Sequence, residues 1–337
     1  APDGSFTGNG PFLDDPNEAG RVNVNQTYLF AEKIADGSEG LGWGYRSDLL
    51  YGVDGNEGQS FGNPPGTFDF ANGWDHGIYE WAMPQLYGEM AYDKLSVKLG
   101  HFYTPTGYEV VPPAGNFFFS RQITWYNGEP FTHTGALSTY KYSDKLSLTG
   151  GWALGWDSGF GQFNGGNMAI LGSTYKLSDE ITVTYFGGFG NFGWRGSQGS
   201  LNGLITSVKL TEKLSSVHQF DVLGTNNAAD PVAPGGNFAQ DGVAGDNVAL
   251  VNYLFYDMNE KWRAGVRAEW YKADGVSYNT ATYGLNFKPR PNLLIRPEMR
   301  HLWAPGVPGG APGTIAGNVA RIYDKNNVFG MDAIWSF

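Results

Sequence analysis

Apolar and polar residues alternate along short segments of this chain, from RVNVNQTYLF (21–30) to FGMDAIWSF (329–337). In KWRAGVRAEWY, for example, Trp262, Val266 and Trp270 alternate with Arg263 and Glu269. Successive side chains of a β-strand point to opposite faces, so this period of two predicts strands with one apolar face. Fifteen such segments begin near residues 22, 41, 79, 94, 131, 145, 168, 180, 201, 214, 247, 261, 278, 292 and 327.

Alternation alone fits two architectures. A soluble β-sandwich turns its apolar face inward, whereas a membrane β-barrel turns that face toward lipid. The segments are about ten residues long, which is the length that a tilted strand needs to cross a bilayer. Trp and Tyr residues gather at the segment ends, as at Trp43, Tyr92, Trp156 and Trp303. Aromatic girdles at both membrane interfaces would place them there.

The connections between the segments alternate in length, which also favours the membrane barrel. Short turns are predicted at 93–94, 143–145, 178–180, 211–213, 258–260 and 289–291. Long Gly/Pro/Asn-rich connections lie at 104–130, 157–167, 191–200, 225–246, 272–277 and 304–326. Outer-membrane barrels have short periplasmic turns and long extracellular loops. We therefore predict an all-β fold in which residues 1–337 form a single transmembrane antiparallel β-barrel domain.

The strand number follows from a parity argument. Single-chain bacterial barrels have an even number of strands, so one strand is missing from the fifteen segments. If the last strand ends at the short-turn side, the strand that begins at 22 also runs toward that side. A chain that enters the barrel from the short-turn side then needs one strand before it. Residues 3–13 are the remaining candidate, although the N-terminal segment 1–20 is polar and rich in Gly. We expect about 16 strands, with 14 and 18 as alternatives.

The composition agrees with a β-rich envelope protein and excludes some functions. The chain contains 50 Gly, 22 Phe, 19 Tyr and 11 Trp but no Cys, so disulfides and thiolate metal sites are excluded. Its formal net charge of -11 argues against a nucleic-acid partner, which would need basic clusters. The first residues, APDGSF, suit a chain cut after a small-residue signal-peptide site.

Four stretches resemble the OmpL-like β-barrel porins, a family of bacterial outer-membrane channels. They are NQTYLFAEK (25–33), YRSDLLYGVDG (45–55), KLGHFYTPTGYEVVPPAGNFFFSR (98–121) and PFTHTGALSTYKYSDKLSLTGGWALGWDSGF (130–160). The resemblance rests on distinctive motifs over 20–160 and on the general pattern over 160–337. It implies a pore in the bacterial outer membrane and does not name a solute.

The connection 104–130 is the candidate pore-constricting loop. Its first part, TPTGYEVVPPAGNFFFSR, is too long for a turn and too apolar for an exposed loop, and its prolines oppose pairing as a central strand. Folded into the lumen, it would place Glu109 and Arg121 at a constriction, with Tyr108 beside them. The alternative is that the loop packs against the wall and its charges are paired structurally.

Charged residues on the predicted inward faces are candidates for lining the pore. They are Arg46, Asp48, Glu89, Arg263, Arg267, Glu269, Arg296, Glu298 and Arg300. Fixed charges in a pore set its ion preference. Alternatively, the two groups 263–269 and 296–300 lie on strands two apart and neutralise one another as a ladder. Both statements can hold together.

Two long connections are acidic and contain no Lys or Arg. Residues 54–78 carry Asp54, Glu57, Asp69 and Asp75, and residues 225–246 carry Asp230, Asp241 and Asp246. These loops could bind divalent cations that bridge to lipopolysaccharide, or they could be ordinary solvated loops. DGNEG (54–58) lacks the full ligand spacing of a calcium loop. We expect no other metal site and no cofactor.

No catalytic constellation is evident in the sequence. GGFGNFG (187–193) contains G-x-G-x-x-G, but no helical segment follows it to bind a pyrophosphate. The five His residues show no metal-ligand spacing, and Asp157 and Ser158 do not form a triad with His133 from sequence alone. We therefore predict a non-enzymatic channel for passive diffusion of ions and small hydrophilic solutes. The alternatives are an outer-membrane enzyme and a structural or adhesive barrel that does not conduct.

The C-terminal segment predicts how the chain is assembled. Phe329, Met331, Ala333, Trp335 and Phe337 alternate toward lipid. Such an aromatic ending resembles the signal that barrel-assembly machinery recognises, so Trp335 and Phe337 are the candidate assembly residues. The expected partners are this machinery, lipid, lipopolysaccharide, small solutes and, by analogy with other sixteen-stranded porins, two further copies in a homotrimer.

Overall fold

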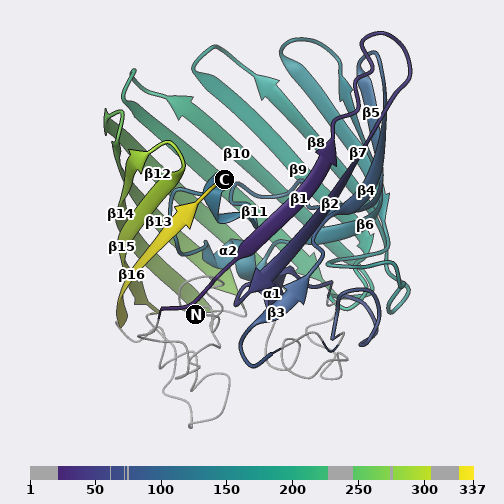
Figure 1. The fold of residues 1–337 in the computed structure, drawn as a ribbon, viewed down its shortest axis with the longest axis horizontal. Helices are drawn as coiled ribbons and strands as arrows, with labels where there is room; N and C mark the ends of the chain where they lie inside the picture. Colours follow the sequence, from purple (N-terminus) through teal and green to yellow (C-terminus); the bar gives the residue numbers. More distant parts are fainter. Residues whose placement is uncertain are drawn as a thin grey trace.

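The computed structural model describes residues 22–60, 62–71, 73, 76–226, 246–273, 276–304 and 326–337. They form one antiparallel sheet of 16 strands that curls into a barrel (Figure 1). The first eight strands are β1 (Thr27–Lys33), β2 (Gly42–Gly52), β3 (Glu80–Ala82), β4 (Leu86–Tyr92), β5 (Leu95–Tyr103), β6 (Thr132–Lys141), β7 (Leu146–Ala153) and β8 (Asn167–Lys176). The others are β9 (Ile181–Asn191), β10 (Gly199–Lys209), β11 (Leu214–Thr225), β12 (Asn247–Asn259), β13 (Trp262–Ala273), β14 (Val276–Arg290), β15 (Leu293–Trp303) and β16 (Asn326–Trp335).

Among the described residues, helical structure is confined to three short segments of connections: α1 (Gly55–Gly58), the 3-10 helix η1 (Pro113–Gly115) and α2 (Ile123–Asn127). No helix in the part of the chain given above is long and apolar enough to span a bilayer. The barrel strands instead cover the predicted segments closely. Their residues alternate because every second side chain faces the other side of the sheet.

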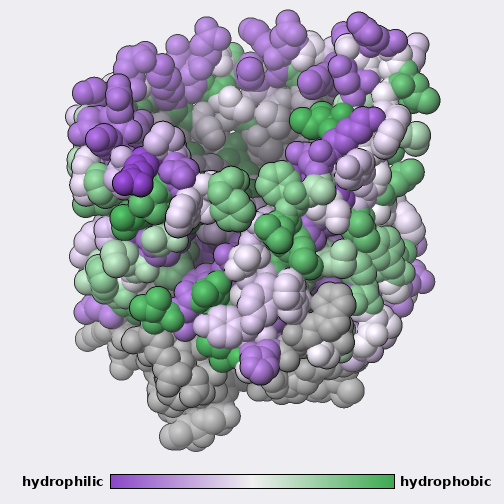
Figure 2. Space-filling model, viewed as in Figure 1, coloured by the Kyte–Doolittle hydropathy of each residue, from purple (hydrophilic) through white to green (hydrophobic). Residues whose placement is uncertain are grey.

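On strands such as β2, β13 and β16 the alternating apolar residues face outward, as predicted, whereas β8, β9 and β10 also carry apolar residues that face inward. On β16 the side chains of Phe329, Met331 and Trp335 are 61%, 60% and 72% exposed, while Asp332 between them faces the interior and bonds to Arg296. In Figure 2 the hydrophilic residues gather at the rim that carries the short turns, and apolar residues are frequent on the wall below it. An exposed apolar band below a polar rim is the outer surface of a membrane barrel.

The strand count agrees with the prediction, but for a different reason. The predicted segment near 79 is divided into β3 and β4, and both pair with β2. Pro84 lies between them and has no N–H to donate, so the ladder is interrupted there. The sheet runs in order from β1 to β16 with β3 off this path. β1 and β16 point the same way (Figure 1), and the predicted earlier strand at 3–13 lies outside the described residues.

The two ends of the barrel differ as the connection lengths predicted. The short-turn end carries 93–94, 142–145, 177–180, 210–213, 260–261 and 291–292, and also the eight-residue link 34–41 from β1 to β2. The other, long-loop end carries 104–131, 154–166 and 192–198, and the strands that flank the connections 53–79, 226–246 and 304–325 have their ends there. The prediction of a long connection at 272–277 was wrong, because β13 and β14 continue pairing as far as Ala273 and Val276.

The interior holds an apolar core on the side of β6 to β12. Inward residues such as Ile170, Phe186 and Leu201 are 1%, 1% and 0% exposed, and Phe117 and Phe118 of the connection 104–131 join the same cluster. Gly265 on β13 leaves room for this contact, since a Cβ there would lie 2.4 Å from the ring of Phe117. The connection 104–131 is therefore packed inside the barrel.

Candidate functional site: the lumen and the loop folded into it

The loop 104–131 joins β5 to β6 but is bound to the opposite wall. Its side chains and backbone bond to residues of β11, β12, β13 and β15, more than 90 positions away in the chain. Gly107 has φ 81, a left-handed conformation that favours glycine, and a Cβ there would lie 1.9 Å from a carboxylate oxygen of Glu129. This turn lets the loop fold back on itself within the lumen.

Arg267 on β13 is the central contact of this loop. Its side chain is fully buried and pairs with Glu109 of the loop at 2.7 Å and with Glu269 of its own strand at 2.8 Å. Its two terminal nitrogens also donate to the carbonyl oxygen of Ser120 (2.8 Å), the hydroxyl of Ser120 (2.9 Å) and the carbonyl oxygen of Arg121 (3.1 Å). One guanidinium thus fixes two separate parts of the loop.

Arg296 on β15 makes a second attachment. Its Nη1 donates to three carbonyl oxygens of the loop, those of Pro113 (2.9 Å), Asn116 (2.7 Å) and Phe118 (3.1 Å). Its other nitrogens form a bidentate pair with Asp332 of β16, at 2.9 Å and 2.5 Å. The pair holds the planar guanidinium in place, so its remaining donors point at the loop.

Two carboxylates of the wall accept backbone N–H groups of the loop. Glu298 on β15 accepts from Phe119 at 2.7 Å and from Ser120 at 3.2 Å. Glu269 on β13 accepts from Ile123, the first residue of α2, at 2.7 Å. A carboxylate that satisfies otherwise unpaired buried N–H groups replaces water that the loop loses on entering the barrel.

The ladder predicted between the two charged groups is present in part. Arg267 and Arg300 both pair with Glu269, the latter at 3.4 Å from β15. Arg263 does not join it; its Nε lies 3.1 Å from Asp257 and its side chain is 40% exposed. Most of the predicted wall charges are therefore buried beneath the loop rather than facing water.

The three predicted loop residues lie together on the inner side of the loop. Glu109 and Arg121 are each 4% exposed, and the Arg121 guanidinium donates to the carbonyl oxygen of Val111 at 2.6 Å. The backbone N–H of Tyr108 donates to Gln219 of β11 at 3.0 Å, and burial raises the pKa of the Tyr108 hydroxyl. Glu109 binds the wall through Arg267, and Arg121 contacts Val111 and the ring of Trp125 within the loop, so both residues would act on a pore through the position of the loop.

A second charged group lies on β1 and β2. Asp48 is 1% exposed and accepts from Arg46 at 2.5 Å and from Gln85 at 2.7 Å, as well as from the Tyr28 hydroxyl. Arg46 also pairs with Glu32 at 3.1 Å, and these two side chains are 17% and 33% exposed. This group therefore keeps a charged surface toward the lumen.

Glu89 lies in the half of the barrel nearer the short turns. It is opposite Lys98 in the pairing of β4 with β5, and both side chains are half-buried and inward. Lys98 also lies over the ring of Tyr87, 4.6 Å from its centre. Arg263 lies at the edge of the loop, with its guanidinium 5.7 Å from the ring centre of Phe117.

A buried acid pair under the loop was missed by the sequence reasoning. Gln219 of β11 donates through one nitrogen to Glu129 of the loop (2.5 Å) and to Asp221 of β11 (2.6 Å), and the two acids are 1% and 0% exposed. Burial raises the pKa of Glu129 well above its usual range, and the neighbouring Asp221 raises it further. The inward position of Asp221 on an alternating strand was the one available signal.

The Ser and His residues do not form a catalytic site. Ser60 Oγ lies 3.3 Å from His101 Nε2, but His101 Nδ1 lies 2.8 Å from the hydroxyl of Thr134, not from an acid, and all three side chains are buried. His133 Nδ1 lies 3.0 Å from the carbonyl oxygen of Gly155. Neither imidazole combines an acidic partner with an accessible nucleophile.

Asp157 and Asp69 have structural roles in the long-loop region. Asp157 accepts the backbone N–H groups of Phe131 (2.5 Å) and Thr132 (3.1 Å), where the loop 104–131 enters β6. Burial raises its pKa to about 7, in spite of these donors. Asp69 accepts from Ser60 and Met83, and burial raises its pKa to about 6.

Only part of the acidic-loop prediction can be compared with the structure. Asp75, Asp230 and Asp241 lie outside the described residues. Within the described ranges, no group of three or more His, Asp or Glu residues is placed to hold a metal ion. The cation sites expected at 54–78 and 225–246 remain a prediction.

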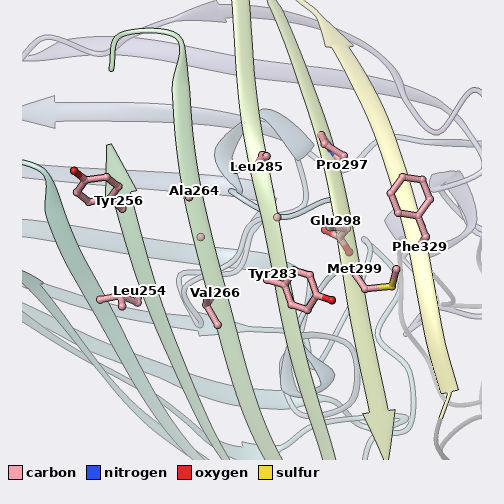
Figure 3. A pocket seen from close by; sticks show the side chains of 12 residues that line it. Leu254, Tyr256, Ala264, Val266, Tyr283, Leu285, Pro297, Glu298, Met299 and Phe329 are labelled. Atoms are coloured by element: carbon pink, nitrogen blue, oxygen red, sulfur yellow. The ribbon is translucent and has the colours of Figure 1, made fainter. Parts of the chain in front are cut away.

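A groove of about 520 Å³ lies on the outer face of the wall, away from the lumen. Figure 3 shows large side chains of β12, β14 and β16, among them Tyr256, Tyr283 and Phe329, around the small Ala264 of β13. The groove is lined almost entirely by apolar atoms, so it belongs to the lipid-facing surface.

An antiparallel barrel with an apolar outer band, short turns at one end and a loop fastened inside defines a β-barrel channel protein of the porin class. The model of the family described as "Putative beta-barrel porin-2, OmpL-like" matches residues 3–337. The chain belongs to this family. It is an outer-membrane porin of bacteria and not an enzyme.

Solved structures share the fold. The outer membrane channel DcaP of Acinetobacter baumannii has a TM-score of 0.57 at 12% identity, over 94% of this chain and 86% of that one. The anion-selective porin from Comamonas acidovorans gives 0.55 at 10%, over 85% and 81%. OmpT of Vibrio cholerae, in its trimer form, gives 0.55 at 12%, over 94% and 93%. No curated protein matches the sequence significantly.

Proposed function

We propose that this porin is a passive diffusion pore for ions and small hydrophilic solutes, and that the loop 104–131 narrows it. The observation that carries the proposal is the fastening of the loop to β13 and β15 inside the barrel, through Arg267, Arg296 and Glu298. A loop held by buried charges has a fixed position, so the free cross-section beside it is fixed as well.

The remaining lumen surface suits water and small solutes. The half nearer the short turns has inward Thr149, Thr182 and Thr184 that are half-buried, together with the partly exposed Arg46 and Arg263. Such hydroxyl and charged groups can bond to water or a solute. Solutes would pass beside the loop, along the part of the wall that the interior apolar cluster does not cover.

The two different ends of the barrel also suggest which partners the protein meets on each side of the membrane. We place the short turns in the periplasm and the long loops outside, with the acidic loops near lipopolysaccharide and its divalent cations. Trp335 and Phe337 would be read by the barrel-assembly machinery. The trimer form named for the Vibrio cholerae OmpT supports a homotrimer for this chain.

A non-conducting structural barrel is the second candidate, and one observation favours it. The apolar cluster that includes Phe102, Leu137 and Phe186 fills one side of the interior at the level of the loop. If this cluster and the loop together closed the lumen, the protein would serve the envelope without transport.

Liposome swelling separates the two candidates. Folded protein, recognised by the shift of its gel mobility on boiling, is placed in liposomes that are diluted into neutral sugars of increasing size. We expect rapid swelling with the smallest sugars and a cut-off above a defined size. Absence of swelling with every solute, from protein that shows the mobility shift, would establish the closed barrel instead.

A further inference from the structure

Four lysines occupy equivalent inward positions at the short-turn end of four strands. Lys141, Lys176 and Lys209 are the last residues of β6, β8 and β10, and Lys288 lies near the end of β14. All four side chains are exposed. Because these strands run in the same direction on one curved wall, the lysines form an arc around the mouth of the lumen (the lysine arc).

The strand pairing fixes the inward orientation of the arc. Lys141 is opposite Ser147, Lys176 is opposite Thr182 and Lys209 is opposite Ser215, all at alternating positions that face the interior. The preceding tyrosines of β6 and β8, Tyr140 and Tyr175, are each 43% exposed on the lipid side. For Lys288 the preceding Phe287 stacks outside on Trp262, with ring centres 4.2 Å apart.

The spacing lets the charges of the arc act together. Neighbouring strands are about 4.8 Å apart, and the register places each lysine two residues beyond the position level with the one before it, so successive lysines are about 12 Å apart. This is comparable with the Debye length of about 10 Å at an ionic strength of 0.1 M. The fields of Lys141, Lys176 and Lys209 therefore overlap across the mouth instead of acting singly.

The acids near the arc do not cancel it. Asp257, the inward acid of β12, is paired with Arg263 at 3.1 Å. Lys209 lies 2.9 Å from Glu212, but both side chains are largely exposed, and such a pair contributes little. The turns beyond the strands carry Asp144, Asp179, Glu180, Glu212 and Glu260 together with Lys145, Lys213 and Lys261. These turn charges stand outside the lumen, and their excess of two negative charges (five acids against three lysines) is smaller than the four positive charges of the arc.

We propose that the lysine arc makes the periplasmic mouth of the pore selective for small anions. Each of three lysines is paired across the strands with a hydroxyl, so the mouth offers ammonium and O–H donors, which oxyanions such as carboxylates and phosphates accept. A positive potential at a pore mouth raises the local concentration of anions and lowers that of cations. The inference rests on the proposed diffusion function, because selectivity has meaning only for an open lumen.

The test is the reversal potential in planar bilayers under a tenfold KCl gradient. The triple variant Lys141→Gln, Lys176→Gln, Lys209→Gln is compared with the matched control Lys145→Gln, Lys213→Gln, Lys261→Gln. The control also removes three lysine charges, but it removes them from the turns at the same rim and not from the arc. We expect the wild-type protein and the control to favour chloride. The arc variant should lower the chloride-to-potassium permeability ratio by about twofold or more.

The outcomes distinguish this inference from the proposed function. A chloride preference that is lost only in the arc variant supports the inference. Equal permeability ratios in both triple variants would overturn the lysine arc while leaving the diffusion pore intact. Absence of conductance from folded wild-type protein would overturn both.

Discussion

Replacing Arg267 with Met should release the loop 104–131 from the barrel wall. The substitution removes four hydrogen bonds to the loop and leaves Glu109 and Glu269 buried without this cation. Removing one partner of a buried ion pair typically costs about 3–5 kcal/mol. Since about 1.4 kcal/mol is a factor of ten, the detached state of the loop should gain roughly 10²- to 4 × 10³-fold in population.

Hydrogen exchange of the loop amides measures this directly in the folded, detergent-solubilised protein. Arg263→Met is the matched control, because Arg263 lies on the same strand, is 40% exposed and has its ion pair with Asp257. It meets the loop only weakly, with its guanidinium 5.7 Å from the ring centre of Phe117, and not through a buried ion pair. An exposed pair contributes about 0–1 kcal/mol, so the control should keep wild-type protection. In Arg267→Met we also expect larger and noisier single-channel currents. Equal exchange of 104–131 in both variants would refute the anchoring role of Arg267.

Four further predictions address single parts of this account. Gly265→Val should push Phe117 away and speed exchange of the loop, at a cost of about 1–3 kcal/mol, whereas Gly88→Val, where a Cβ meets nothing within 4 Å, should not. Burial raises the pKa of Asp157 to about 7 from an ordinary value of 3.8. The protonated Asp157 carboxyl therefore stabilises the fold fully below about pH 4, and this stabilisation is lost as the pH rises through 7. Proteolysis at 154–166 should therefore slow between pH 8 and pH 5 in the wild type, and Asp157→Asn should abolish this dependence; an unchanged pH profile in the variant would contradict it. Burial and the neighbouring Asp221 raise the pKa of Glu129, so the wild type should lose stability as the pH rises while Glu129→Gln should not, and equal pH dependence of the two unfolding temperatures would contradict this. Deleting Phe337 should lower the yield of heat-modifiable barrel in the outer membrane without changing the stability of the molecules that fold, and an unchanged yield would exclude its role in assembly.

The wall of the barrel could be predicted from the sequence because its physics is local. Each strand has one lipid face and one lumen face, so a period of two appears in the residues themselves, as in Phe329, Met331 and Trp335 around Asp332. The inward orientation of Arg267, Arg296 and Glu298 followed from the same alternation. The alternation could not show that β3 and β4 are two parts of one predicted segment, since that depends on a single proline.

The contacts of the loop could not be predicted, because they join residues far apart in the chain. Glu109 and Arg267 are separated by 158 positions, and nothing near either residue specifies the other. The sequence did indicate a loop too apolar for water, and both its constricting and its wall-packing interpretations stayed open. The structure shows the packing in atomic detail, while the effect on solute passage is a proposal.

The central claim is that this barrel contains a water-filled path beside a fixed loop. Single-channel recording of the folded wild-type protein in planar bilayers tests it most directly. We predict discrete, stable conductance steps at neutral pH. Failure of folded, heat-modifiable protein to produce any conductance step would contradict the claim.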